Sequence, residues 1–385
     1  MKKIIILISL AVISCTNINP DFNTNPDYNK SGRYGTFKID TLYAVRDSML
    51  ERSPLNTNTS TKLTLANMDG VKAAFVMRFI NLPPDSVTVT KVDLTFDTFG
   101  FFGDTTKSTA RVMVYKANKL WDASSVVNQD DDWRTNPPDE LVTEMNVSLV
   151  DSMQNKVEIP MNLFEEWRNT ADSLNFGLYF KLADEETNLV CEFNSINSTD
   201  HPKLNFTFAA DSADTVAATN DATIFDYDKT QGSALDTKSL FVSSGVPFRA
   251  LLKFDFSNIP KDAIYFYSNL QLGEADESPY KNPKKTTQII FHAVTNLDGE
   301  EFNPATAFSL KNVAGYYELN SPDILGTRFT QEVANGTFTN EWFEIQYQYE
   351  ISVPGFDESD FSKTSFKGVN NTDKPMLILK YFTNK

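Results

Sequence analysis

Short runs in which apolar and polar residues alternate recur along almost the whole chain. Typical runs are "AAFVMRF" (73–79), "KVDLTFDTF" (91–99) and "NFGLYFKLA" (175–183). A period of two places successive side chains on opposite faces of a strand. The runs are short, and Asn, Asp, Pro and Gly separate them, as is typical of turns. The pattern predicts an all-β chain built from antiparallel β-sandwiches.

One segment departs from this alternation. In "PMNLFEEWRNTADS" (160–173), Leu163, Phe164 and Trp167 fall at helical spacing. We therefore predict one short helix in the first half of the chain. The second half has no obvious equivalent.

The same strand motif occurs twice. Residues 71–85 read "VKAAFVMRFINLPPD" and residues 247–262 read "PFRALLKFDFSNIPKD"; they align without a gap on Pro83 and Pro260, an offset of 177 (260 − 83). Two further blocks match in the same order: "IDTLYAVRD" (39–47) with "ADTVAATND" (213–221), and "FNSINSTDHPKLNF" (193–206) with "FKGVNNTDKPMLIL" (366–379). Three ordered matches predict a tandem duplication of a domain of about 170 residues.

The repeat and the N-terminal composition divide the chain into four predicted parts. Residues 1–14 are a lipoprotein signal peptide, and residues 15–36 are a polar tether rich in Asn, Asp, Pro and Gly. Residues 37–209 form the first β-sandwich domain, and residues 210–385 form the second. Each sandwich is expected to be jelly-roll-like.

The N-terminus carries a targeting signal. Lys2 and Lys3 precede an apolar run over residues 4–13, which is too short to span a bilayer. "VISC", ending at Cys15, resembles a bacterial lipobox, so we predict lipidation of Cys15; an ordinary secretory signal is the alternative. Thr16 replaces the usual inner-membrane retention aspartate. The predicted location is therefore lipid-anchored, in the outer membrane or at the cell surface.

Charge and composition narrow the possible functions. The net charge of −16 disfavours binding to nucleic acid. After lipidation of Cys15, Cys191 has no disulfide partner, and two histidines are too few for a zinc site with several His or Cys ligands. We therefore predict that the chain is not an enzyme, with a paired-carboxylate glycosidase as the remaining catalytic alternative.

These blocks resemble the DNRLRE-type domains of bacterial and archaeal surface proteins. The resemblance rests on "FRALLKFDFSNIP" (248–260), "VMVYKANKLWDASSVV" (112–127), "HPKLNFTF" (201–208) and "KPMLILKY" (374–381), and so covers both halves. It implies jelly-roll sandwiches and, in some relatives, binding of acidic polysaccharides. The chain departs from the family where Met77 and Arg78 replace Phe-Asp, and where the second copy lacks the middle tryptophan.

Aromatic residues in the loops are the candidate ligand contacts. Sugar rings stack on exposed Trp and Tyr faces. Trp133, beside "RTNPPDE", is the leading candidate, followed by Trp121, which also fits a core position. Tyr316 and Tyr317 are the candidates in the second copy.

The densest acidic cluster is "NQDDDW", which contains Asp130, Asp131 and Asp132. Carboxylates in a loop suit Ca²⁺, but the spacing is not that of an EF-hand, and a solvated loop is the alternative. No cofactor is certain; a structural Ca²⁺ is the one candidate.

Together these observations predict a noncatalytic cell-surface lipoprotein that binds polysaccharide through its β-sandwiches. The alternative is a structural or assembly subunit of an outer-membrane or surface-layer complex. Its partners would be the membrane, through the lipid anchor, and either a polysaccharide or an outer-membrane protein.

Overall fold

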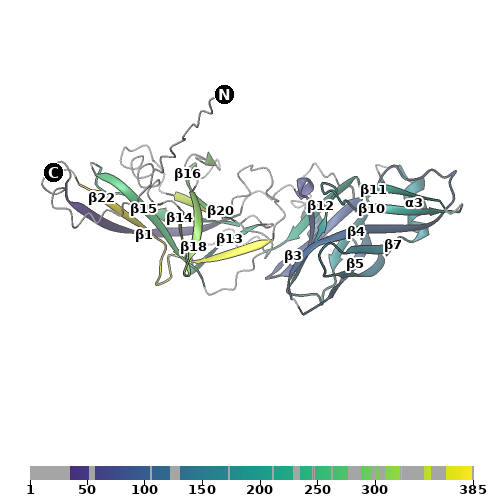
Figure 1. Cartoon of the computed structure of the whole chain (residues 1–385), viewed down its shortest axis with the longest axis horizontal. Helices are drawn as coiled ribbons and strands as arrows, with labels where there is room; N and C mark the ends of the chain where they lie inside the picture. The colour runs from purple at the N-terminus through teal and green to yellow at the C-terminus, as the bar shows by residue number, and fades with distance from the viewer. Residues whose placement is uncertain are drawn as a thin grey trace, which may run out of the picture.

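A computed structural model of the chain describes residues 35–51, 57–104, 106–121, 131–171, 174–209, 212–228, 235–244, 246, 248–261, 263–275, 288–296, 301–302, 308–320, 322, 342–347 and 361–383. The strands of these residues pair antiparallel throughout and form two units that lie side by side (Figure 1). This confirms the predicted all-β class and its antiparallel sandwich arrangement.

The first unit contains the strands between residues 62 and 226. They are β2 (Lys62–Met68), β3 (Val71–Arg78), β4 (Val89–Gly103), β5 (Thr109–Lys116), β6 (Leu141–Ser148), β7 (Gln154–Glu158), β8 (Leu178–Leu182), β9 (Leu189–Asn194), β10 (Lys203–Phe208), β11 (Ala213–Ala217) and β12 (Asn220–Asp226). They pair in the order β11-β10-β4-β9-β2-β3-β8-β5-β6, with β12 on β3 and β7 on β4. Its short helices are η1 (Thr57–Thr59), α2 (Asp131–Thr135) and α3 (Met161–Asn169).

The core of the first unit follows from alternation along its strands. On β3, Phe75 and Met77 are fully buried and point into this core. The Phe75 ring stacks on Phe180 of β8 with centroids 4.5 Å apart, and meets Phe96 of β4 edge-on at 6.5 Å. Each such side chain contributes about 1.5–3 kcal/mol by leaving water.

Helix α3 confirms the one predicted helix. It begins after Pro160, and its apolar stripe of Leu163, Phe164 and Trp167 is buried against the first core. Its last turn carries Arg168, whose Nε lies 2.9 Å from Asp85. Among the residues that the structure describes, no helix is both long and apolar enough to cross a bilayer.

The second unit contains the strands that follow residue 238, together with one strand from the start of the chain. They are β1 (Phe37–Glu51), β13 (Ser239–Ser244), β14 (Phe248–Phe254), β15 (Ile264–Gly273), β16 (Ile289–Asn296), β17 (Glu301–Phe302), β18 (Phe308–Val313), β19 (Tyr316–Leu319), β20 (Trp342–Tyr347), β21 (Ser362–Lys367) and β22 (Met376–Phe382). Nine of them pair in the order β17-β16-β18-β19-β15-β22-β1-β14-β20, and β13 pairs with β21.

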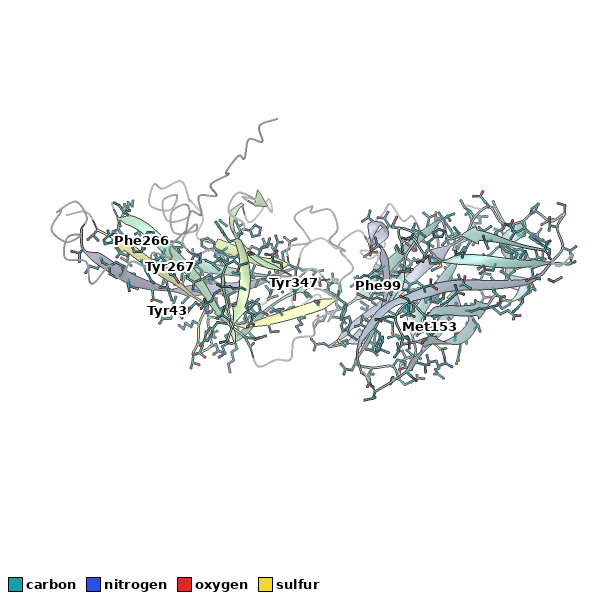
Figure 2. All side chains as sticks on the ribbon, in the orientation of Figure 1. Tyr43, Phe99, Met153, Phe266, Tyr267 and Tyr347 are labelled. Carbon is teal, nitrogen blue, oxygen red and sulfur yellow. The ribbon has the colours of Figure 1, made fainter. Side chains whose placement is uncertain are left out.

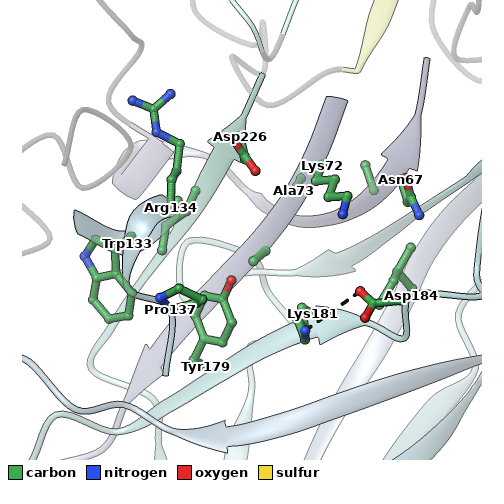
Figure 3. Close-up of a pocket in the computed structure, with 14 residues that line it drawn as sticks. Asn67, Lys72, Ala73, Trp133, Arg134, Pro137, Tyr179, Lys181, Asp184 and Asp226 are labelled. Carbon is green, nitrogen blue, oxygen red and sulfur yellow. Dashed lines mark ion pairs between the residues drawn. The ribbon is translucent and has the colours of Figure 1, made fainter. Parts of the chain in front are cut away.

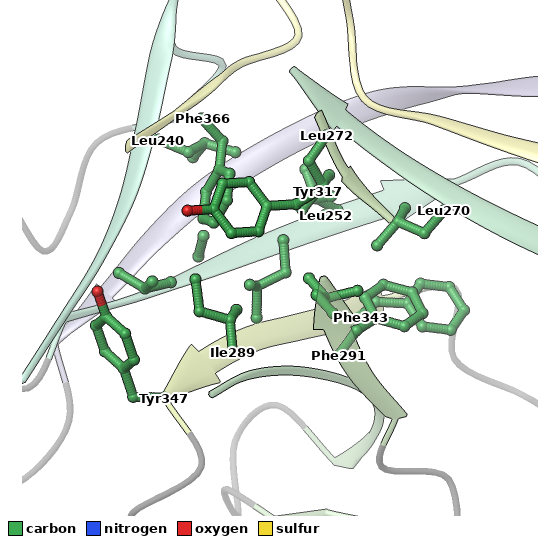
Figure 4. Close-up of a cluster of buried hydrophobic side chains, with 14 of the residues drawn as sticks. Leu240, Leu252, Leu270, Leu272, Ile289, Phe291, Tyr317, Phe343, Tyr347 and Phe366 are labelled. Carbon is green, nitrogen blue, oxygen red and sulfur yellow. The ribbon is translucent and has the colours of Figure 1, made fainter. Parts of the chain in front are cut away.

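Aromatic rings fill the core of the second unit (Figure 4). Phe343 of β20 stacks on Phe291 of β16 with centroids 4.9 Å apart. Tyr317 of β19 meets Phe366 of β21 edge-on at 5.2 Å. The motif Phe248–Pro260 supplies the alternating strand β14, so the repeated motif is part of the scaffold.

Strand β1 precedes the first unit in sequence but lies in the sheet of the second unit (Figure 1). Its first half pairs with β22, where Phe37 is opposite Phe382. Its second half pairs with β14, where Glu51 is opposite Phe248. β1 is therefore a central strand whose neighbours come from the other copy of the repeat.

The converse exchange occurs in the first unit. Strands β11 and β12, which match β1 in the repeat, pair with β10 and β3. Asn220 lies opposite Arg78, and Asp226 lies opposite Lys72. Each copy of the repeat thus gives its first strand to the sheet formed by the other copy.

This exchange departs from the sequential division of the chain predicted above. The sequential division places residues 37–51 in the first sandwich, but they pair within the second; it places residues 213–226 in the second, but they pair within the first. The physical reason is that matching blocks in a repeat have equivalent edges, so either copy of the strand fits either sheet.

An apolar junction connects the two units. The Phe361 ring lies 6.4 Å from both Phe102 and Phe225, which belong to the first unit. Lys363 of β21 forms an ion pair with Asp69 of the β2–β3 turn, at 2.6 Å. The units are therefore packed together as well as interlocked by strands.

Candidate ligand-binding pocket

A pocket of about 220 Å³ opens on the outer face of the first unit (Figure 3). Strands β2, β3, β8 and β12 form its floor, and residues 133–137 form one wall. Strand β12 is an exchanged strand, so the second copy of the repeat supplies part of the pocket. The volume is below the ~300–1,000 Å³ typical of pockets for drug-sized ligands, and suits one small ring.

The wall is held against the sheet by two tryptophans. Trp121 donates its Nε1–H to the carbonyl oxygen of Phe176 at 2.8 Å. Trp133 stacks on Tyr179 of β8, with centroids 5.8 Å apart and planes 12° from parallel. Lys119 covers the Trp133 ring, with its Nζ 4.7 Å from the ring centroid. These contacts form a small second apolar cluster on the outer face of the sheet.

The pocket rim carries more positive than negative side chains. Lys72, Arg134 and Lys181 line it together with Asp184 and Asp226. Lys181 Nζ lies 3.9 Å from Asp184, in an exposed and therefore weak ion pair. Three cations against two carboxylates give the pocket a small positive balance, opposite in sign to the net charge of −16 of the chain.

Tyr179 lies at the base of the pocket. Burial, and to a lesser extent the negative charge of Asp226, raise the pKa of its hydroxyl above the ordinary value. The group therefore remains protonated at neutral pH and can both donate and accept a hydrogen bond. Figure 3 shows this hydroxyl pointing toward the pocket.

The structure corrects the predicted role of the tryptophans. Trp133 is 2% exposed and Trp121 is 5% exposed, so neither ring presents a free face on which a sugar could stack. Trp133 still lines the pocket. Its loop-like sequence context did not indicate that Trp133 lies on the short helix α2, packed on the outer face of the sheet.

The acidic cluster is only partly described. Asp130 lies outside the described residues, and of Asp131 only its place at the start of helix α2 is given. Asp132 forms an ion pair with Lys119 at 2.7 Å and accepts a hydrogen bond from Asn136 Nδ2. The hydrogen bond from Lys119 has the largest effect, and together with that from Asn136 it lowers the pKa of the Asp132 carboxyl. The Asp132 carboxylate is thus already paired with a cation, and the described residues contain no group of three or more His, Cys, Asp or Glu placed to hold a metal.

Tyr316 and Tyr317 are neighbours on β19 and therefore point to opposite faces. Tyr317 is buried against Phe366, whereas Tyr316 is 39% exposed. Both belong to the second unit, so the structure does not combine them with Trp121 and Trp133 in one site.

The corresponding place in the second unit holds a buried ion pair. The offset of the repeat aligns Lys72 with Arg249, and the strand pairing aligns Lys181 with Glu344. Arg249 Nη1 lies 2.7 Å from Glu344 Oε1, and both side chains are buried. His292 adjoins this pair, with its Nε2 3.9 Å from the same Glu344 oxygen.

The residues that line the pocket were not among the predicted contacts, apart from Trp133. The repeat aligns Lys72 with Arg249, so the sequence alone contains a signal for Lys72. Lys181 and Tyr179 have no such signal, because only the pairing of β3 with β8 brings them beside Lys72.

Comparison with known proteins adds little to this picture. No family model and no curated protein matches the chain. Among solved structures, the Macrobrachium rosenbergii nodavirus structure is 7% identical over 92% of each chain, with a TM-score of 0.15. The C-terminal domain of the Streptococcus agalactiae AgI/II polypeptide BspA is 6% identical over 88% of this chain and 91% of that chain, with a TM-score of 0.16. Scores this low carry no argument about this protein.

Proposed function

We propose that this protein is a noncatalytic, lipid-anchored surface protein whose first unit binds an acidic sugar residue of a polysaccharide in the pocket beside Tyr179. The resemblance of its repeated motif to DNRLRE-type domains supports the same class of function.

The main support for this proposal is that the first unit has two cations at the positions where the second unit has an ion pair. Where the second unit has Arg249 paired with Glu344, the first unit has Lys72 and Lys181. Two lysines cannot neutralise each other, and the nearby carboxylates of Asp184 and Asp226 are exposed at the rim. Asp184 and Asp226 balance the lysines only from exposed positions, so a carboxylate or sulfate of a sugar placed between the lysines would be a further partner for both.

The rest of the pocket suits a sugar ring. The Tyr179 hydroxyl and the Asn67 side chain offer hydrogen-bonding groups, and Pro137 and Ile224 offer apolar surface. Asn67 is fixed by donating its Nδ2–H to the carbonyl oxygen of Glu186 at 3.0 Å, which leaves its side-chain oxygen as an acceptor. The described residues that line the pocket include Asp184 and Asp226 but no histidine or cysteine.

Calorimetric titration with acidic and neutral oligosaccharides tests this proposal. We expect an oligosaccharide rich in uronic acid to bind, and each of Lys72→Met and Lys181→Met to weaken that binding about fivefold, the loss of roughly 1 kcal/mol. The matched control is Lys374→Met, an exposed lysine of the second unit, which should leave binding unchanged. Failure of every oligosaccharide to bind, or equal effects of all three variants, would contradict the proposal.

The anchor is tested separately. Cys15 lies outside the described residues, and its lipidation is proposed from the sequence alone. Cys15→Ala should move the protein from the membrane fraction to the soluble fraction. Retention of the variant in membranes would refute the anchor without bearing on sugar binding.

A second candidate function is that of an assembly subunit. It is favoured by exposed apolar side chains on the first unit, where Phe99 is 39%, Val150 50% and Met153 45% exposed (Figure 2). Thr98, next to Phe99, donates its backbone N–H to the carbonyl oxygen of Met153, and Met153 donates its own to the carbonyl oxygen of Val150. Such a patch fits a protein partner, and Met153→Asp should then abolish recovery of a stoichiometric partner from detergent-solubilised membranes.

A further inference from the structure

We propose that the outer face of strands β1, β15 and β22 rests on the surface of a lipid bilayer. We call this surface the anchor face and define it by Phe37, Ile39, Tyr43, Ile264, Phe266 and Phe382. The inference goes beyond the sugar site. It concerns which end of the protein faces the membrane, and it rests on the proposed attachment at Cys15.

Strand register sets these side chains on one surface. Directly opposite residues of an antiparallel pair point to the same face of the sheet. Phe37, Phe382 and Ile264 are mutually opposite and form a first row. Ile39, Lys380 and Tyr267 form the second row in the same way.

This surface is apolar and open to solvent. Phe37 is 40%, Ile39 55% and Ile264 47% exposed. The Phe37 ring lies 6.1 Å from Phe266 and 5.8 Å from Phe382, so the aromatic rings form a continuous group. Figure 2 shows Tyr43, Phe266 and Tyr267 in the same unit, remote from Phe99 and Met153.

The charge on the anchor face suits a phospholipid surface. Lys380 is the one ionic side chain in the first two rows, and its Nζ lies 4.1 Å from the centroid of the Tyr267 ring. The nearby carboxylate of Asp40 is directed to the other face, where it accepts a hydrogen bond from the Tyr381 hydroxyl at 2.5 Å. Aromatic rings with an occasional lysine are typical of side chains at membrane interfaces.

The proposed lipid attachment at Cys15 favours a bilayer, rather than a second copy of the chain or another protein, as the surface that covers the anchor face. The anchor face begins at Phe37, and Cys15 lies 22 positions earlier (37 − 15). A coil of that length has a mean end-to-end distance of roughly 25 Å. Lipid attachment at Cys15 would therefore hold the anchor face within reach of the headgroups.

Strand exchange determines which unit would lie nearest the membrane. Because β1 belongs to the second unit, the second unit would lie nearest the membrane, although the first unit comes earlier in sequence. The pocket belongs to the first unit, so it would lie in the unit that does not carry the anchor face. This arrangement suits a site that meets a polymer outside the cell.

Fluorescence quenching on vesicles tests the inference without depending on lipidation or on sugar binding. The chain from residue 16, with an N-terminal hexahistidine tag, is held on phosphatidylcholine vesicles that contain a nickel-chelating lipid and a brominated phosphatidylcholine. A dye is attached at Tyr43→Cys, and the control chains carry it at Val313→Cys or Leu141→Cys, which replace residues 42% and 47% exposed. Cys191 is fully buried and does not compete for the dye.

We expect brominated lipid to quench the dye at position 43 at least twofold and to leave both controls unchanged. Adding Ile39→Asp and Ile264→Asp should remove this quenching, while circular dichroism shows an intact fold. Equal quenching at all three positions, or none at position 43, would overturn the proposal. If the chain sediments as a dimer and the dye at position 43 is shielded from solvent in it, the anchor face binds a second copy and the proposal is overturned. If a membrane protein shields the dye instead, the anchor face binds a protein partner and the proposal is likewise overturned.

Discussion

Asp47 and Asp221 occupy equivalent places in the two units, although each comes from the copy of the repeat that forms the other unit. Asp47 Oδ2 accepts the backbone N–H of Val369 at 2.6 Å, and Asp221 Oδ2 accepts that of Ile196 at 2.8 Å. Val369 and Ile196 are themselves matched in the repeat. One buried carboxylate in each unit therefore ties the exchanged strand to the turn that receives it.

The Asp221 carboxyl should make stability depend on pH. Burial raises its pKa from 3.8 to about 7, against the lowering effect of the Ile196 N–H. The folded state then holds a proton that the unfolded state has lost, so stability should fall as pH rises from about 4 to 7, by at most ~4 kcal/mol. Asp221→Asn should flatten this slope in urea unfolding measured across that range.

Asp214→Asn is the matched control, because Asp214 is exposed on the neighbouring strand β11. It should leave the slope unchanged. Burial also raises the pKa of Asp47, so part of the slope should survive in Asp221→Asn. If Asp221→Asn has the same slope of stability against pH as the unchanged protein, the Asp221 carboxyl has the same pKa in the folded and unfolded states.

Strand exchange predicts which fragments fold. A fragment of residues 57–228 contains β12 and should unfold cooperatively by circular dichroism. A fragment of residues 37–209, which follows the sequential boundary, lacks β12 and carries an unpaired β1. It should be poorly folded or aggregate, because the edge of β3 is left open. Equal stability of the two fragments would contradict the exchange.

The buried ion pair between Lys62 and Glu192 should be sensitive to removal of one partner. Lys62 Nζ lies 3.2 Å from Glu192 Oε2, and both side chains are almost fully buried. Lys62→Met should destabilise the fold by about 3–5 kcal/mol in urea unfolding, because it leaves a buried carboxylate without its lysine. The double variant Lys62→Met with Glu192→Leu should recover most of that loss; if it is no more stable than the single variant, packing rather than charge is responsible.

Much of the fold could be predicted from alternation and repetition. Alternation in "AAFVMRF" predicts the strand that the structure shows as β3, and the helical spacing of Leu163, Phe164 and Trp167 predicts the helix α3. The exchange could not be predicted, because periodicity identifies a strand without identifying its neighbours. The duplicated copies make this worse, since β1 and β12 present similar edges to similar partners.

The pocket was harder to predict than the fold. Lys72, Tyr179 and Lys181 lie on two strands about a hundred residues apart, and ordinary strand alternation explains each of them. Their proximity depends on the register of β3 with β8. The loop-like context of Trp133 predicts exposure, but Trp133 is buried because it packs on Tyr179 of β8, and the local sequence does not encode this contact.

Gly177 should tolerate no side chain. Its φ is +82°, and a Cβ there would lie 2.0 Å from the carbonyl oxygen of Met77. Gly177→Ala should therefore destabilise the first unit by at least ~2 kcal/mol in thermal or urea unfolding.

Gly70 provides the control for this change. It has a similar φ of +77°, but no atom lies within 4 Å of a Cβ built there. Gly70→Ala should cost only about 1 kcal/mol, from backbone strain alone. If both variants lose the same stability, the contact with Met77 is relieved by backbone movement.

The place of β1 also sets the order in which the protein can mature. Of the described strands, β1 is synthesised first, yet its neighbour β22 ends at Phe382, close to the end of the chain. The second unit therefore cannot close until almost the entire polypeptide has emerged, whereas the first unit is complete once β12 has appeared. Loop closure across more than three hundred residues is slow. Until then β1 remains an open strand, and it is the part of the nascent protein that most needs protection from aggregation.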